Sequence, residues 1–139
     1  MLSRSARTVA AAALVAAVAA CAGPSHVDHA QSADVAKTIA ATQGPDGIQE
    51  VTIKTTNDFR FDPPTVTAHT GKVKVTLVDV GSYPHNLSVA AMHFTSDTVT
   101  GGPGQNMTTF TMTFAKPGTY PFVCTFHSSA GMRGTFLIH

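Results

Sequence analysis

Three residues near the C-terminus have side chains that bind transition metals, and they fall within nine positions of one another. They are Cys124, His127 and Met132, in the pattern C-x2-H-x4-M. A thiolate, an imidazole and a thioether in one short loop suit copper, because soft sulfur favours the cuprous state and imidazole tolerates both oxidation states. With two Cys, seven His and five Met in the chain, chance gives only about 0.004 such matches. The spacing therefore predicts a copper site.

A fourth ligand has to come from elsewhere in the chain, and His85 is the candidate. It follows Gly81-Ser82-Tyr83-Pro84, which breaks a strong predicted strand. Two imidazoles and a thiolate in one plane, with a long axial thioether, form the geometry of electron-transfer copper. The alternative is that Cys124 is a buried cysteine acting as a small hydrophobe, with His127 and Met132 as incidental neighbours.

Period-two alternation of apolar and polar residues begins at Ile48 and predicts the scaffold that holds these ligands. Such alternation is typical of half-buried strands. The apolar positions are Val51 and Ile53; Val73, Val75 and Leu77; Phe110, Met112 and Phe114; Tyr120, Phe122 and Cys124; and Phe136 and Ile138. Turn residues separate these segments, and no segment reads as a convincing core helix. Seven or eight short strands with this spacing favour an all-β sandwich or barrel of about 90 residues.

The first twenty residues predict an export signal. Two arginines precede an apolar run over residues 8–20, which is too short to span a bilayer. The run ends in Val18-Ala19-Ala20-Cys21, which resembles the lipobox of bacterial lipoproteins. That resemblance implies cleavage before Cys21 and acylation of its sulfur, which gives a strong membrane anchor because two acyl chains hold where one dissociates. The alternative is ordinary cleavage at Ala17-Val18-Ala19, which leaves Cys21 as a plain thiol.

The chain divides into three predicted segments: a lipoprotein signal peptide at residues 1–20, a flexible tether at residues 21–47 and one domain at residues 48–139. Runs of Gly, Pro, Ser and Gln mark the tether, and its His26 and His29 are expected to be solvated rather than to bind metal. Nine Lys+Arg stand against eight Asp+Glu, so no basic field marks a nucleic-acid-binding protein. The length of 139 residues agrees with one domain.

Five segments of the domain match one known family. They are Phe61-Asp62-Pro63, Gly71 with the strand after it, Pro84-His85-Asn86, Tyr120-Pro121-Phe122-Val123-Cys124, and the loop to Met132-Arg133-Gly134. On these residues the domain resembles the small blue copper proteins of the cupredoxin family, and its C-x2-H-x4-M spacing is that of the plastocyanins. The resemblance implies an antiparallel Greek-key β-sandwich of seven or eight strands and one type 1 copper ion.

The same resemblance implies roles for individual residues. The copper ligands would be His85, Cys124, His127 and Met132. Asn86 would brace the cysteine loop by hydrogen bonds. His127 would be the electron port, exposing a ring edge through an apolar patch supplied by Gly81, Pro84 and Phe126.

Some features depart from the pattern of that family or lie outside it. The acidic residues are scattered, so the acidic docking patch of plant plastocyanins is not expected. Residues 90–105 match nothing securely, and we expect Met92 and His93 to be a loop pair without metal, a second copper contact being the alternative. His69 and His139 are likewise expected to bind no metal.

Together these expectations point to the transfer of single electrons, with no substrate turned over. Redox protein partners, for example a membrane oxidase or reductase, would meet the protein at the extracytoplasmic face of the cell membrane, where a lipid on Cys21 raises their effective concentration. The same four ligands would serve a cell-surface protein that captures or delivers copper, so the spacing leaves this alternative open. Multicopper enzymes need further His clusters and domains, and a binuclear purple copper site needs a second Cys in the loop; the sequence has neither.

Overall fold

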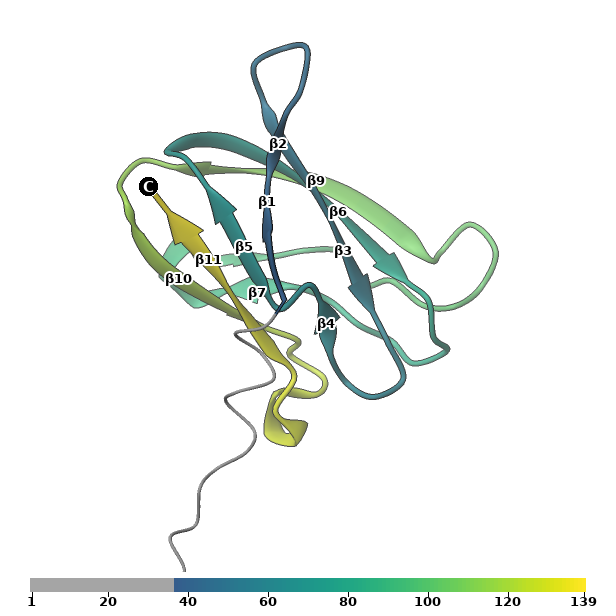
Figure 1. Cartoon of the computed structure of the whole chain (residues 1–139). Helices are drawn as coiled ribbons and strands as arrows, with labels where there is room; N and C mark the ends of the chain where they lie inside the picture. The colour runs from purple at the N-terminus through teal and green to yellow at the C-terminus, as the bar shows by residue number, and fades with distance from the viewer. Residues whose placement is uncertain (1–36) are drawn as a thin grey trace, which may run out of the picture.

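Two β-sheets make up the computed structural model of the protein, which describes residues 37–139 (Figure 1). The alternating apolar residues form one hydrophobic core. The strands of this part of the chain are β1 (Thr38–Ala40), β2 (Thr42–Gln43), β3 (Gln49–Thr55), β4 (Phe61–Asp62), β5 (Thr65–Ala68), β6 (Gly71–Asp79), β7 (Ser88–Val89), β8 (Phe94–Thr95), β9 (Met107–Phe114), β10 (Gly118–Val123) and β11 (Arg133–Ile138). Two short 3₁₀ helices, η1 (Ala90–Met92) and η2 (Ser128–Ala130), lie among them. The first sheet has the order β1-β5-β11-β10-β7-β8, and the second has the order β2-β3-β6-β9, with β4 paired to β3.

The core lies between the sheets, because every second side chain of a strand points to the same face. β6 shows this most clearly, since Val73, Val75 and Leu77 are fully buried. Aromatic rings join the two layers: Phe114 of β9 contacts Phe136 of β11, with ring centroids 5.4 Å apart. The predicted all-β sandwich is therefore confirmed.

The pairing of the strands differs from the predicted antiparallel arrangement. Within residues 37–139 the sheets are mixed, because β3 pairs parallel to β6, and β5 pairs parallel to both β1 and β11. The chain crosses to the other sheet between the members of each such pair and returns in the same direction, whereas hairpins such as β10–β11 reverse it. The described residues also form eleven strands instead of seven or eight, since several are two-residue strands too short to show alternation.

The structure also shortens the predicted tether. Strands β1 and β2 fall within the range predicted for the tether, and they are outer strands of the two sheets. Thr38 pairs with Thr65 of β5, and Thr42 pairs with Glu50 of β3. All side chains of β1 and β2 are exposed, so backbone hydrogen bonds hold these strands and no buried face appears in their sequence. The predicted signal peptide, Cys21, His26 and His29 lie outside the described residues.

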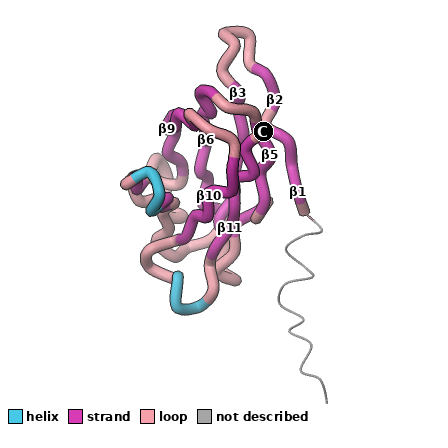
Figure 2. The backbone as a smooth tube through the Cα atoms, turned by 90° about the vertical axis from the view of Figure 1, so that its left-hand side faces the viewer, coloured by secondary structure: helices cyan, strands magenta, loops and turns pink. Residues whose placement is uncertain are grey.

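One end of the sandwich carries the loop that joins β10 to β11. Figure 2 shows η2 within this loop, beyond the ends of the strands. Among residues 37–139, no helix is long and apolar enough to cross a membrane.

Candidate metal centre

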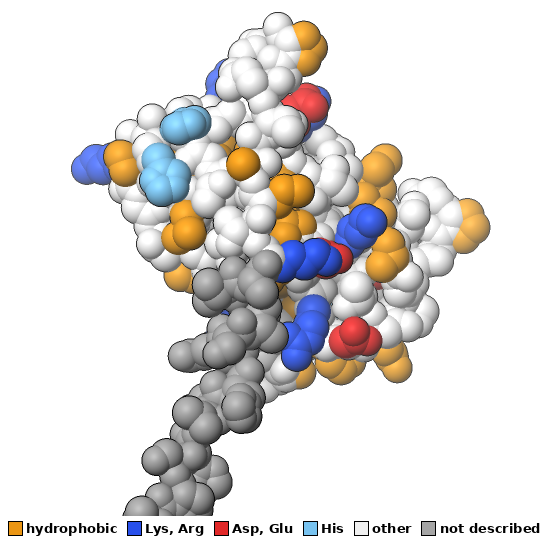
Figure 3. All heavy atoms as spheres, in the orientation of Figure 1, with side chains coloured by type: hydrophobic (Ala, Val, Ile, Leu, Met, Phe, Trp, Pro, Cys, Tyr) orange, Lys and Arg blue, Asp and Glu red, His pale blue; other side chains and the backbone are white. Residues whose placement is uncertain are grey.

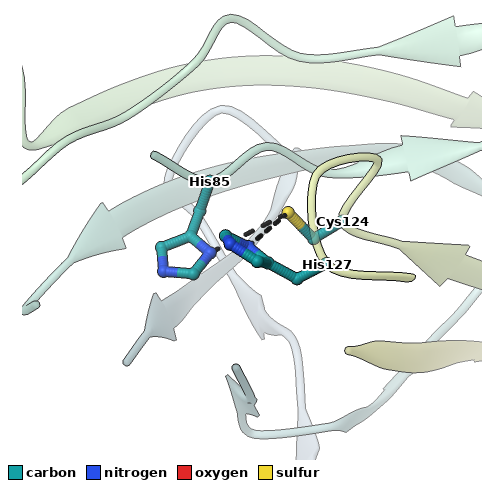
Figure 4. A group of neighbouring side chains, drawn as sticks. All are labelled: His85, Cys124 and His127. Atoms are coloured by element: carbon teal, nitrogen blue, oxygen red, sulfur yellow. Dashed lines mark hydrogen bonds between the residues drawn. The ribbon is translucent and has the colours of Figure 1, made fainter. Parts of the chain in front are cut away.

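Three of the predicted metal ligands converge at this end of the sandwich. The Sγ of Cys124 lies 3.8 Å from Nδ1 of His85 and 3.6 Å from Nδ1 of His127, and the three ligand atoms all lie within 4.8 Å of one another. Figure 4 shows the two rings beside the sulfur, with His85 arriving from a different segment of the chain. Cys124 and His85 are fully buried, and His127 is half-buried.

Backbone hydrogen bonds hold the loop that carries Cys124, His127 and Met132. The N–H of Cys124 donates to the carbonyl of Met132 over 3.2 Å, and the N–H of Met132 donates to the carbonyl of His127 over 3.1 Å. Met132 is fully buried. Gly131 has a φ of 86°, a conformation that glycine adopts without steric cost, and this turns the chain towards β11. The C-x2-H-x4-M spacing thus corresponds to a closed loop whose first and last residues are joined.

Val99 holds the backbone of His85 in place. The N–H of His85 donates to the carbonyl of Val99 over 2.9 Å, and the N–H of Val99 donates back to the carbonyl of His85 over 2.8 Å. Two residues after His85, the N–H of Leu87 donates to Oγ of Ser96 over 3.0 Å, and Ser96 lies three residues before Val99. Residues 90–105, for which the sequence showed no resemblance, therefore contain the residue that positions the predicted ligand His85. The available signal was the fully buried Val99, the one apolar residue in residues 95–102.

Asn86 braces the cysteine loop from the neighbouring segment. Its Nδ2 donates to Oγ1 of Thr125 over 2.8 Å, and its Oδ1 accepts from the N–H of Thr125 over 2.9 Å. Thr125 directly follows Cys124, and Asn86 directly follows His85. These hydrogen bonds therefore tie two ligand-bearing segments together one residue away from the ligands.

Aromatic residues that the sequence did not assign to the site contact His127. The ring of Phe59 stacks on the imidazole, with centroids 4.2 Å apart and planes inclined by 19°. Tyr83 approaches the same imidazole edge-on, with centroids 6.4 Å apart, and also contacts Phe59. In the expected apolar patch, Phe126 is 50% exposed and Pro84 is exposed, while Gly81 is half-buried. The surface beside His127 is therefore mainly aromatic.

The surroundings of His85 favour its neutral form. Burial lowers the pKa of His85 below its ordinary value, His127 lowers this pKa further, and Asp79 opposes the change. Within residues 37–139, Nε2 of His85 is buried and has no hydrogen-bond partner. A neutral imidazole is the form that binds a metal ion.

The spacing of the donor atoms fits a metal ion held between them. Metal–sulfur and metal–nitrogen bonds of about 2.3 and 2.0 Å, spread in a plane, separate sulfur from nitrogen by about 3.7 Å. The two distances from Sγ of Cys124 are 3.6 and 3.8 Å. Two imidazoles and a thiolate beside a buried methionine are the donor set of a type 1 copper ion.

Met92 and His93 have surroundings that differ from those of the three ligand residues. Met92 belongs to η1 and packs against the hydrophobic core, while His93 is exposed. Among the described residues, the group of His, Cys, Asp or Glu side chains able to share a metal contains His85, Cys124 and His127, without His93.

Comparison with known proteins agrees with this fold. The plastocyanin of Dryopteris crassirhizoma is 26% identical, and the match covers 64% of this chain and 100% of that one with a TM-score of 0.50. Auracyanin from the photosynthetic bacterium Roseiflexus castenholzii is 20% identical over 74% of this chain and 97% of its own, with a TM-score of 0.53. The metal-binding domain of the Cu(I)-exporting P-type ATPase CopA of Streptococcus pneumoniae D39 is 13% identical over 73% and 95%, with a TM-score of 0.59. The last two show the fold alone.

A family model, described as the cupredoxin-like domain, matches residues 11–138 and thus most of the chain. The donor set at the site fits one type 1 copper ion. On this match, the fold and the donor set, the chain belongs to the cupredoxin-like family.

Proposed function

We propose that this protein carries single electrons between redox partners at the outer face of the cell membrane. Copper bound at the site supplies a one-electron couple. His85, Cys124, His127 and Met132 would hold the ion. The observation that carries the proposal is the assembled donor set, in which both Nδ1 atoms already lie 3.6–3.8 Å from the sulfur.

The hydrogen bonds around the ligands support electron transfer in particular. Both the N–H and the carbonyl of His85 form hydrogen bonds with the backbone of Val99. The cysteine loop is closed by its own backbone hydrogen bonds and is also hydrogen-bonded to Asn86. Ligands held in this way by the sandwich move little when the charge of the site changes. A small movement keeps the reorganisation energy of electron transfer low.

The surface near His127 supports its role as the electron port. This imidazole is the half-buried member of the set, and the rings of Tyr83 and Phe126 beside it are 48% and 50% exposed. Partners in electron transfer form small, short-lived interfaces. An uncharged aromatic rim around a ligand suits such a contact, because it brings a partner close to the ring without strong ion pairs.

Copper capture or delivery is the alternative use of the same ligands. Such a protein has to pass the ion to a partner through ligand exchange, yet His85, Cys124 and Met132 are all fully buried. The similarity to the CopA domain extends to the fold alone at 13% identity. Burial of three of the four proposed ligands therefore favours movement of the electron over movement of the ion.

A visible spectrum of the copper-loaded protein, titrated with ascorbate and then reoxidised, tests the proposal. We expect an intense blue absorbance that bleaches on reduction and returns on oxidation. Cys124→Ser should abolish the colour, whereas Cys21→Ser, the matched cysteine control, should keep it. A colourless protein that retains Cu(I) and resists oxidation would instead establish copper delivery.

The proposed location depends on the lipobox-like sequence that ends at Cys21. Metabolic labelling with a fatty acid, followed by membrane fractionation, tests it. The wild-type protein and Cys124→Ser should both be labelled and membrane-bound, while Cys21→Ala should accumulate as an unlabelled precursor. Normal maturation of Cys21→Ala would contradict the lipid anchor and leave the copper chemistry untouched.

A further inference from the structure

Two histidines lie opposite each other where β5 and β11 end, far from the copper ligands. The N–H of His139 donates to the carbonyl of Ala68 over 2.9 Å, and the N–H of Thr70 donates to the carbonyl of His139 over 3.0 Å. Hydrogen bonds on both sides of His69 are the pattern by which parallel strands place two residues opposite one another. They extend the β5–β11 register one step beyond the Ile138–Ala68 pair.

Both imidazoles point to the outer face of the sheet. Along the paired strands β5 and β11, pairs that point into the core alternate with pairs that point outwards. The pair of Phe136 and Val66 is buried, whereas the pair of Leu137 and Thr67 is half-buried. His69 and His139 continue the outward series, and both are exposed. Strands in a sheet lie about 4.8 Å apart, which brings the two rings within reach of one ion. Figure 3 shows two histidine side chains next to each other over the ends of β5 and β11.

Buried Gln49 fixes the backbone of His69. Its Nε2 donates to the carbonyl of His69 over 2.8 Å, and its Oε1 accepts from the N–H of His69 over 2.7 Å. Gln49 is only 6% exposed. The backbone around His69 is therefore bonded towards β11 on one side and to Gln49 on the other. Within residues 37–139, neither imidazole has a hydrogen-bond or ion-pair partner, so both keep a nitrogen free for a ligand.

We propose that His69 and His139 form a second metal site, a surface pair that chelates one divalent ion such as Zn²⁺, Ni²⁺ or Cu²⁺. Imidazole nitrogen is a preferred ligand of these ions, and water completes the coordination at an exposed site. Once one ring binds, the second ring on the adjacent strand is held close by, so the pair binds more tightly than isolated histidines.

This site is separate from the copper ligands and does not depend on the proposed electron transfer. β11 leads from Arg133, which follows Met132, to His139 at the other end. At about 3.3 Å per residue, this separates the two sites by roughly 20 Å. An ion can therefore occupy the histidine pair while the type 1 site stays filled.

Calorimetric titration of Zn²⁺ into the copper-loaded full chain tests the proposal, at a pH above the ordinary imidazole pKa of about 6.5. We expect one equivalent of Zn²⁺ to bind. His69→Gln and His139→Gln should each weaken this binding by roughly ten- to a hundredfold, and the double variant should abolish it. His93→Gln, which removes another exposed histidine, should change nothing. Amide chemical shifts in NMR spectra should move at the ends of β5 and β11.

Several outcomes would overturn the site. They are the absence of a Zn²⁺ equivalent in the wild-type protein, its persistence in the double variant, and its loss in His93→Gln. Persistence in the double variant would assign the ion to other residues. Blue absorbance is read from the same samples, so a failure of the histidine pair is distinguishable from a failure of the type 1 site.

Discussion

The ring of Phe59 lies nearly flat against the imidazole of His127, with centroids 4.2 Å apart and planes inclined by 19°. Phe59 reaches this position with a φ of 57°, in the left-handed region that residues other than glycine rarely adopt. Such a conformation costs about 1–3 kcal/mol and persists where the surrounding structure imposes it. Its occurrence beside a metal ligand indicates that the stack fixes the orientation of the His127 ring.

Substitutions of Phe59 should shift the reduction potential of the bound copper. Phe59→Leu removes the aromatic ring and keeps the strained backbone, whereas Phe59→Gly removes the ring and relieves the strain. An aromatic stack contributes about 0.5–1.5 kcal/mol, which corresponds to a shift of up to about 60 mV for one electron. Cyclic voltammetry should show shifts of the same sign for both variants, because both lose the stack. Phe126→Leu, whose ring lies 6.4 Å from His127, is the control and should leave the potential unchanged.

Asn86→Ala should destabilise the fold and loosen the cysteine loop. The hydrogen bonds that Asn86 makes with the backbone N–H and with the hydroxyl of Thr125 contribute about 0.5–1.5 kcal/mol each, so the free energy of unfolding should fall by about 1–3 kcal/mol. Denaturant unfolding monitored by circular dichroism measures this loss. Asn106→Ala removes an exposed asparagine side chain and should cost little. Equal stability of the two variants would show that the Asn86 bonds contribute nothing.

Gly101→Ala should be far more damaging than the same change at the next residue. A Cβ at Gly101 would overlap the carbonyl oxygen of Gly81 and lie 3.1 Å from Cα of Ser82. This contact joins the loop before β9 to the loop that leads to His85, so one of them has to move, at a cost of about 1–3 kcal/mol or more. Gly102 has no atom within 4 Å of such a Cβ, and Gly102→Ala should be tolerated. Thermal unfolding of the two variants, with copper affinity alongside, makes the comparison.

The metal-free protein should lose stability in mildly acidic solution. Because burial lowers the pKa of His85 in the folded state, the unfolded chain binds a proton at a higher pH than the folded chain does. The unfolded state is therefore favoured as pH falls through the ordinary imidazole pKa of about 6.5, and stability is fully present above it. Urea unfolding across this window should show the decline, and His85→Gln should flatten it while His93→Gln should not. A decline of equal slope in His85→Gln would assign the effect to other groups.

The features that could be predicted from sequence are those set by nearby residues. Alternation along β6 and β9 reveals the buried face of each strand, because the period of two is a property of the strand itself. The C-x2-H-x4-M loop is equally local, since its own backbone bonds close it.

Contacts between segments that are distant in the sequence could not be predicted from it. Val99 pairs with His85 through backbone groups, which carry no residue-specific signal. β1 and β2 are likewise held by backbone bonds, with every side chain exposed. Phe59 adopts its unusual φ because of the rings it meets in the folded protein, so its contact with His127 depends on the tertiary structure.

The direction of β1 determines which end of the domain faces an upstream anchor. In the parallel strands β1, β5 and β11, Thr65 pairs with Thr38 on one side and with Thr135 on the other. Thr135 lies two residues after Arg133, the first residue of β11 after the loop that carries Cys124, His127 and Met132. The chain therefore enters the domain at the copper end. A lipid on Cys21 would be linked to it by the sixteen residues 22–37, which reach at most about 55 Å. With such a link, the proposed lipid would attach at the end of the domain that carries His127, and the His69–His139 pair would lie at the opposite end.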